Sequence, residues 1–95
     1  MKVSEVTRET LKTYIGYSAT AQDNIIDVYM ASAKAYIEGY TGLTSYEIDM
    51  HEDITFAYMC LISDMFINRQ STVDKAMSDN PTVKNILSMY AINYL

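Results

Sequence analysis

The stretch Ala33-Lys34-Ala35-Tyr36-Ile37-Glu38-Gly39-Tyr40-Thr41-Gly42 decides the fold of this chain, because it ends a long amphipathic helix. Apolar side chains recur at steps of three and four residues along it and upstream of it, at Ile26, Tyr29, Met30, Ala33, Tyr36, Ile37 and Tyr40. That spacing places them on one side of an α-helix, whereas a half-buried strand requires alternation. Gly42 stands where a helix end takes a left-handed residue. The sequence therefore predicts a helix over about residues 20–40, with Thr20 as its N-cap.

Gly39 lies inside the last turn of this predicted helix. Glycine at such a position costs about 1 kcal/mol relative to alanine. Close approach of another backbone segment would account for a residue without a side chain, so we expect such a contact at Gly39.

A second long helix is predicted over about residues 51–70. Its main apolar stripe consists of Ile54, Ala57, Tyr58, Leu61, Ile62, Met65 and Phe66, and the stripe is widened by Phe56, Met59, Cys60 and Ile67. A helix that is apolar on nearly all sides is buried on several sides. Because a chain of 95 residues has few other elements to cover these sides, we expect another copy of the chain to cover part of them.

The remaining segments predict shorter elements around the two long helices. A short N-terminal helix over about residues 4–14 begins at Ser4 or Thr7 and is stopped by Gly16. Residues 43–50 are expected to form a connecting loop, and the polar residues 71–81 a flexible linker with one helical turn at Val73 to Met77. A short C-terminal helix follows Pro81. The predicted fold is therefore all-α, a small helical bundle in a single domain over residues 1–95.

Composition limits the classes of function. The chain is 49% hydrophobic and includes nine tyrosines and seven methionines, which suit either an ordinary small core or flanks that pack against neighbours. Its net charge of −5 argues against binding of duplex DNA by this subunit alone and against an anionic membrane surface. We find neither a secretory signal peptide nor an apolar stretch long enough to span a bilayer.

No arrangement of residues indicates catalysis, a cofactor or a metal. His51 is the only histidine and Cys60 the only cysteine, nine residues apart in sequence. On one helix that separation is about 13–14 Å along the axis, too far for a catalytic pair. The acidic residues between Glu47 and Asp53 lack the alternating ligands and central glycine of a calcium loop, so they predict a solvated surface. We therefore expect no enzymatic activity.

Four segments, taken in order, carry a family resemblance. They are Leu11-Lys12-Thr13-Tyr14-Ile15, the set Ala33, Tyr36, Ile37, Tyr40, Thr41 and Gly42, the helix end Phe66-Ile67-Asn68-Arg69, and the tail with Pro81, Val83, Ile86, Leu87 and Tyr90. Each motif alone is weak, but their order and spacing over one small chain are distinctive. The chain resembles the small phage head-tail connector family, also called DNA-packaging adaptor proteins.

The resemblance implies a structural virion protein without catalytic activity or cofactor. Members of this kind form a homo-oligomeric ring beneath the portal protein, extend the DNA channel, and support head completion and tail attachment. The implied partners are other copies of the chain, the portal, and a head-completion or tail protein. DNA would pass through the ring without sequence-specific binding, and no membrane is involved. The implied location is the head-tail interface of the virion, and the host cytoplasm during assembly.

The residues expected to contact neighbouring subunits or the portal come from both long helices and the tail. They are Tyr29, Tyr36, Tyr40, Phe56, Met59, Arg69, Ile86, Tyr90 and Ile92. Sequence alone does not separate core from interface at these positions, and the apolar tail is expected to dock either on its own core or on a partner. The alternative function is a small helical regulatory or nucleic-acid-associated domain, which would require a basic recognition helix that the sequence lacks.

Overall fold

The computed structural model describes residues 1–16, 23–68 and 73–91. These residues form a 3-10 turn, η1 (Val3–Glu5), and the helices α1 (Arg8–Ile15), α2 (Asp23–Thr41), α3 (Ser45–Ile48), α4 (Glu52–Ile67), α5 (Val73–Asp79) and α6 (Pro81–Ala91). No strand occurs among them, which confirms the all-α prediction. The body measures 42 × 26 × 18 Å along its principal axes.

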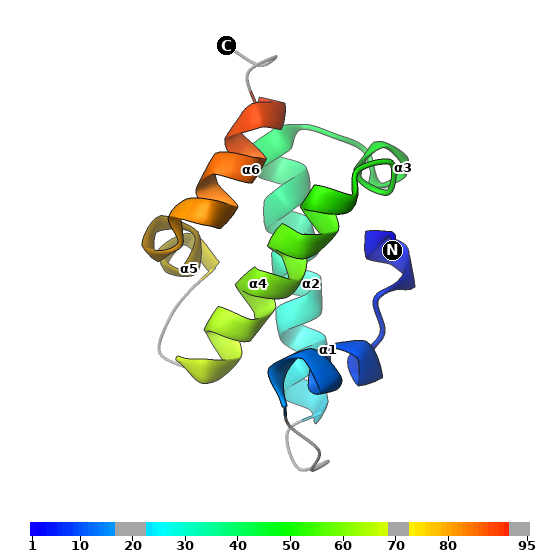
Figure 1. The fold of residues 1–95 in the computed structure, drawn as a ribbon, viewed down its shortest axis with the longest axis vertical. Helices are drawn as coiled ribbons and strands as arrows, with labels where there is room; N and C mark the ends of the chain where they lie inside the picture. The colour runs from blue at the N-terminus through cyan, green and yellow to red at the C-terminus, as the bar shows by residue number, and fades with distance from the viewer. Residues whose placement is uncertain (17–22, 69–72, 92–95) are drawn as a thin grey trace.

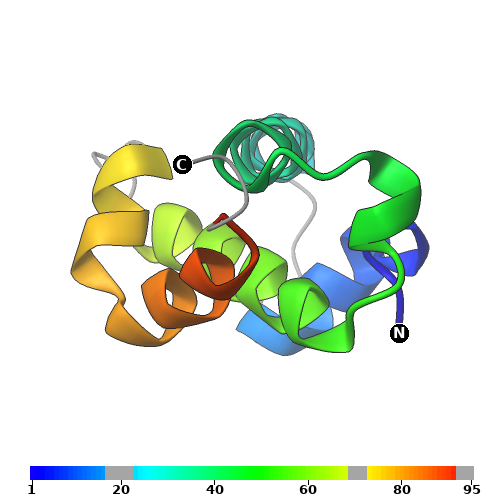
Figure 2. The same cartoon turned by 90° about the horizontal axis from the view of Figure 1, so that it is seen from above.

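The helix α4 is the centre of the bundle. It packs against η1, α1, α2, α5 and α6, and α2 crosses it over much of its length (Figure 1). Seen from above, α2 lies on one side of α4, and α1 and α6 lie toward the other (Figure 2). Both views place α3 with the N-terminal segment at one edge of the molecule and α5 at the opposite edge. The chain thus has two distinct edges on either side of a single core.

The ends of the first two helices follow from local chemistry. The Thr7 hydroxyl accepts a hydrogen bond from the Thr10 amide at 3.1 Å and so caps α1, which ends at Gly16 in the left-handed conformation (φ 86°). The helix α2 ends at Thr41, and Gly42 follows with φ 74°. The Gly42 amide donates to the Glu38 carbonyl at 2.9 Å, satisfying a carbonyl of the last turn. The predicted helix stop at Gly42 is confirmed, whereas Thr20 lies outside the described residues.

The prediction of a loop over residues 43–50 is wrong in part, because residues 45–48 form the helix α3. Thr44 and Glu47 form a capping box in which each side chain accepts from the other residue's backbone amide. Ile48 is only 1% exposed, so this short helix contributes to the core. Backbone hydrogen bonds of the cap and burial of one isoleucine stabilise a helix too short to show an apolar period in sequence.

The helical turn predicted at residues 73–77 of the linker is part of a longer helix, α5, over residues 73–79, and α6 begins at Pro81. Ala76 and Met77 are buried in the core. Their burial stabilises α5, which the mostly polar composition of the segment does not indicate. Asn80 caps α6, because its side-chain oxygen accepts from the Val83 amide at 3.2 Å. Proline at the first helical position has no amide to leave unsatisfied, so Asn80-Pro81 starts a helix here.

The structure limits which part of the second long helix another copy of the chain could cover. That helix, α4, runs from Glu52 to Ile67, and elements of the same chain cover all of its sides except one. The uncovered strip, called here the α4 strip, consists of Phe56, Met59, Cys60 and Ile67, of which Phe56 and Ile67 are exposed and the other two half-buried. Packing of five elements around one helix leaves only this strip for an external partner.

The close contact expected at Gly39 does not occur. A β-carbon built at this position meets no atom within 4 Å, and the residue lies on the exposed side of α2. Within this chain, glycine at position 39 therefore costs helix stability without a packing reason.

Replacement of Gly39 by alanine is expected to raise the free energy of unfolding by about 0.5–1 kcal/mol, because alanine loses less backbone entropy in a helix. The matched control is Gly42→Ala, which forces a β-carbon into a left-handed residue and should lower stability by about 1–2 kcal/mol. Urea unfolding followed by circular dichroism measures both changes. Shifts of the two variants in the same direction would contradict this account.

Candidate functional site

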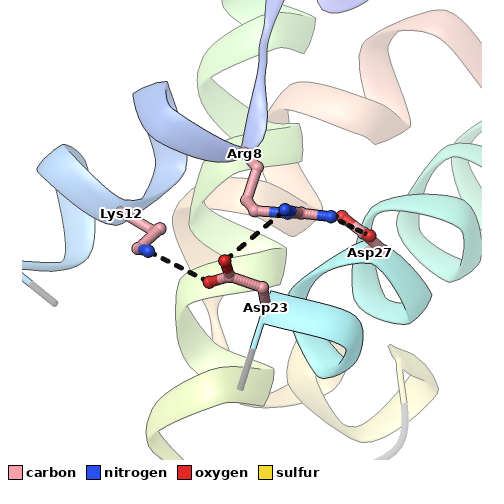
Figure 3. A network of polar contacts seen from close by, with 4 residues as sticks. All are labelled: Arg8, Lys12, Asp23 and Asp27. Atoms are coloured by element: carbon pink, nitrogen blue, oxygen red, sulfur yellow. Dashed lines mark hydrogen bonds and ion pairs between the residues drawn. The ribbon is translucent and has the colours of Figure 1, made fainter. Parts of the chain in front are cut away.

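An ion-pair network fixes α1 against the start of α2 (Figure 3). The Arg8 guanidinium donates from Nε to Oδ1 of Asp27 at 3.0 Å, forms a second contact from Nη2 to the same carboxylate, and reaches Asp23 at 3.4 Å. Lys12 donates from Nζ to the other oxygen of Asp23 at 3.0 Å. The two-point contact with Asp27 has the fork geometry that gives arginine–carboxylate pairs their specificity.

This network lowers the pKa of one carboxyl group and pairs two basic side chains with carboxylates. The hydrogen bond from Arg8 lowers the pKa of the Asp27 carboxyl below its ordinary value of 3.8. The network also pairs two of the chain's cations, Arg8 and Lys12, with carboxylates of the same chain. Neither Arg8 nor Lys12 is therefore an unpaired cation on α1.

Most of the residues expected at an interface lie partly inside the chain's own core. Tyr29, Tyr36, Tyr40, Met59, Ile86 and Tyr90 are half-buried and pack against the buried cluster, whereas Phe56 is 48% exposed. Arg69 and Ile92 lie outside the described residues. Tyr36 and Tyr40 stack on each other with ring centroids 5.8 Å apart, and the Tyr40 hydroxyl forms a 3.1 Å hydrogen bond with Ser88 of α6. These tyrosines join α2 to α6 within one molecule.

Tyr90 has a similar internal role. Its hydroxyl donates to the carboxylate of Asp53, 2.8 Å from each oxygen, and its ring lies 4.6 Å from that of His51. Burial, together with the neighbouring Asp53 carboxylate, raises the pKa of Tyr90 to about 12. The contact fastens the end of α6 to the first turn of α4, so Tyr90 positions an element of the fold.

Several exposed apolar side chains were missed by sequence reasoning. The largest exposures are those of Tyr46 (76%), Ile67 (74%), Met50 (66%), Met89 (63%) and Val28 (61%). Tyr46 and Met50 belong to α3 and the turn after it, a segment expected to be an ordinary loop. The four-residue spacing of Tyr46 and Met50 was the available sequence signal for a helix, but a single pair of residues is too short to establish a helical period.

An open pocket of about 250 Å³ lies between the end of α4 and α5. Its lining combines the apolar Ile67 and Ala76 with Asp64, Asn68 and Asp79. Asp64 accepts a hydrogen bond from the Asn80 side chain at 3.0 Å, and Asp79 forms an exposed ion pair with Lys75 at 3.2 Å. The pocket is smaller than the roughly 300–1,000 Å³ of typical ligand sites.

The described residues contain no group of three or more histidine, cysteine, aspartate or glutamate side chains arranged to bind a metal. Cys60 lies beside Tyr14, with its sulfur 3.4 Å from the phenol oxygen. That hydrogen bond, with burial as a second cause, raises the pKa of Tyr14 to about 12. None of the helices in the described ranges is sufficiently long and apolar to cross a membrane.

Comparison with known protein families shows which family the chain belongs to. The family model of the phage gp6-like head-tail connector protein matches residues 6–92. The chain belongs to this family. Neither the comparison with curated proteins nor that with solved structures gave a match. Membership assigns this connector a structural role in phage, at the head-tail position of the virion, in contact with other head or tail proteins.

The connector motif at the end of α2 has a structural explanation. Ile37 and Thr41 are fully enclosed, and the Thr41 hydroxyl donates to the Ile37 carbonyl at 2.7 Å. The same oxygen accepts from the Leu43 amide at 3.2 Å, beyond the left-handed Gly42. The motif therefore ends a helix and redirects the chain toward α3.

Replacement of Asp27 by asparagine is expected to reduce the pH dependence of the connector's stability. Because the folded pKa of Asp27 is lowered, its ionised form stabilises the fold above the ordinary value of 3.8, and this contribution is lost as the pH falls through the lowered pKa. The urea midpoint of the native chain should fall between about pH 5 and pH 3, and less steeply in the variant. Glu52→Gln removes a carboxylate of α4 that is 86% exposed and pairs with the N-terminal amine, outside the network, and is the control. Parallel curves for Asp27→Asn and the native chain would contradict the assignment.

Proposed function

We propose that this connector assembles as a homo-oligomeric ring beneath the portal protein, extends the DNA channel, and supports head completion and tail attachment. The observation that carries the proposal is the family match over nearly the whole chain. The ring would be built in the host cytoplasm and remain at the head-tail interface of the virion. Its partners would be other copies of itself, the portal, and a head-completion or tail protein.

The shape of the chain supports this proposal. A ring requires head-to-tail contacts between two different and complementary patches on each subunit. The connector has two unlike edges, with α3 at one and α5 at the other (Figure 1). Between them the α4 strip leaves Phe56 and Ile67 exposed, and Tyr14 of α1 lies against its Cys60. We assign the α4 strip to contact with a neighbouring head or tail protein.

The charge of the chain supports passage of DNA. Twelve acidic and seven basic residues give a net charge of −5, and the cations Arg8 and Lys12 are engaged with carboxylates. A ring of such subunits would present negative potential toward the phosphate backbone. Repulsion keeps the duplex from adhering to the wall, so DNA would slide through without sequence-specific contacts.

Replacement of Phe56 by aspartate is expected to abolish co-purification with the portal protein of the same phage, because it places a charge on the α4 strip at its most exposed aromatic residue. The position is 48% exposed, so the melting temperature should change little. Val28→Asp, at a site 61% exposed on α2, is the matched control and should retain the portal. Retention of the portal by Phe56→Asp would exclude the α4 strip as the contact.

Lysine in place of Glu9 and Glu52, two exposed carboxylates, is expected to leave particle assembly intact and to slow DNA ejection. The substitutions add cations that attract phosphates, and attraction of this kind weakens steeply with salt. Ejection from variant particles is therefore measured over a salt series. Glutamine at the same positions controls for loss of the carboxylates alone. Native ejection kinetics in the lysine variant would remove the electrostatic part of the proposal.

A further inference from the structure

The edge formed by α3 presents two exposed apolar side chains that the fold of the chain does not use. Tyr46 is 76% exposed and Met50, one turn further on, is 66% exposed. Both belong to a segment that is held in place by the capping box of Thr44 and Glu47 and by the buried Ile48. Large apolar side chains that remain exposed on a fixed base are typical of interaction sites.

The same segment carries two ionised carboxylates. Glu47 accepts hydrogen bonds from the amide and the hydroxyl of Thr44 at 3.0 and 3.1 Å, and Asp49 accepts from the Ser4 amide at 3.0 Å. These hydrogen bonds lower the pKa of both carboxyl groups, so both are charged at neutral pH. Neither carboxylate takes part in an ion pair with a described residue. The surface called here the α3 face consists of Tyr46, Glu47, Asp49 and Met50.

The surrounding sequence supplies no cations to balance this face. Residues 35–68, which include all of α3 and α4, contain six carboxylates, at Glu38, Glu47, Asp49, Glu52, Asp53 and Asp64, and neither lysine nor arginine. Lys2 and Lys34 contribute to the lowered pKa of Asp49, but less than the hydrogen bond from Ser4, and neither forms an ion pair with it. The α3 face is therefore apolar at Tyr46 and Met50 and negative beside them.

This combination defines the chemistry of a partner. Two copies of the α3 face would repel each other, because like charges that meet at an interface are costly. A second copy also has few cations to offer from elsewhere, since Arg8, Lys12 and Lys75 already pair with carboxylates of their own chain. Copies in the proposed ring would therefore meet through other parts of the surface, and the α3 face suits a different protein that carries positive charge.

We infer that the α3 face docks a basic segment of a neighbouring head or tail protein, in which lysine or arginine side chains flank an apolar side chain. The apolar side chain packs on Tyr46 and Met50, and the cations pair with Glu47 and Asp49. This inference rests on the proposed function and names the chemistry of one partner. The apolar contact supplies most of the affinity, whereas the charges orient the partner and exclude acidic competitors. Both views place α3 at the outer edge of the bundle, where a partner meets it without displacing a described element (Figures 1 and 2).

The first test is titration of the full chain with a helical probe peptide built of leucine and lysine, followed by NMR. A peptide of the same pattern with glutamate in place of lysine is the control ligand. The leucine–lysine peptide is expected to shift the amide signals of residues 45–50, with an affinity that falls as salt rises, because screening weakens exposed charge pairs. The glutamate peptide should leave these signals unchanged. Shifts that avoid residues 45–50, or equal shifts with the two peptides, overturn the inference.

A pair of charge-removing variants separates the α3 face from attraction to the net charge. Glu47→Gln with Asp49→Asn removes both charges and keeps an acceptor oxygen at each position, and glutamine also serves in a capping box. Glu9→Gln with Asp79→Asn removes two exposed carboxylates on α1 and α5 and is the matched control. The first variant should bind the leucine–lysine peptide about threefold to tenfold more weakly, as expected for loss of two exposed charge pairs. The control should bind it like the native chain, and equal weakening in both variants overturns the inference.

The second test uses the purified portal protein and the purified head-completion or tail protein of the same phage. Tyr46→Ala should leave the melting temperature unchanged and weaken binding of one of these proteins about tenfold, as expected for loss of an aromatic anchor. Unchanged binding of both proteins overturns the inference and leaves the proposed function standing. Weaker self-association with unchanged partner binding also overturns it, because the α3 face would then meet another copy. Failure of the native chain to bind either protein would reject the proposed function itself.

Discussion

Burial of α4 is the constraint on which the rest of the structure depends. Leu61 and Ile62 are completely enclosed by surrounding elements of the same chain, and burial of such a side chain contributes about 1.5–3 kcal/mol. A chain of 95 residues buries a limited core, so its margin of stability is small. This explains why segments with a polar composition still fold as helices. The short helices α3 and α5 are stabilised by the residues that they add to this core, and their own helix propensity contributes little.

The tyrosines show how the same residues serve both packing and orientation. The rings of Tyr36, Tyr40 and Tyr90 lie against the core, while the hydroxyls of Tyr40 and Tyr90 bind Ser88 and Asp53. These bonds join α2 to α6 and α6 to α4, so they fix the angle at which the last helix lies. A leucine at these positions would provide comparable burial without this directional contact. The high tyrosine content therefore has an internal function before any interface is considered.

Enclosure of α4 also determines which surfaces remain for other proteins. Once the covering elements are in place, exposed apolar side chains remain on the α4 strip, at the α3 edge, and at Val28 of α2 and Met89 of α6. An outer surface with separate apolar regions suits a subunit that meets different neighbours in different directions, as a phage connector does.

The sequence alone determined that the chain is all-α, through the helical spacing of its apolar residues. The same spacing, with glycines that end helices, showed where α1, α2 and α4 lie. The ordered motifs from Leu11 to Tyr90 were sufficient to place it among the connectors. Sequence could not assign α3 and α5, because helices of four and seven residues show too little periodicity. It also could not tell that Tyr90 is an internal contact while Tyr46 is exposed. The exposure of a side chain depends on which elements pack against it. Those elements can be distant in sequence, as the contact between Tyr90 and Asp53 shows. Only the tertiary structure therefore separates core from surface.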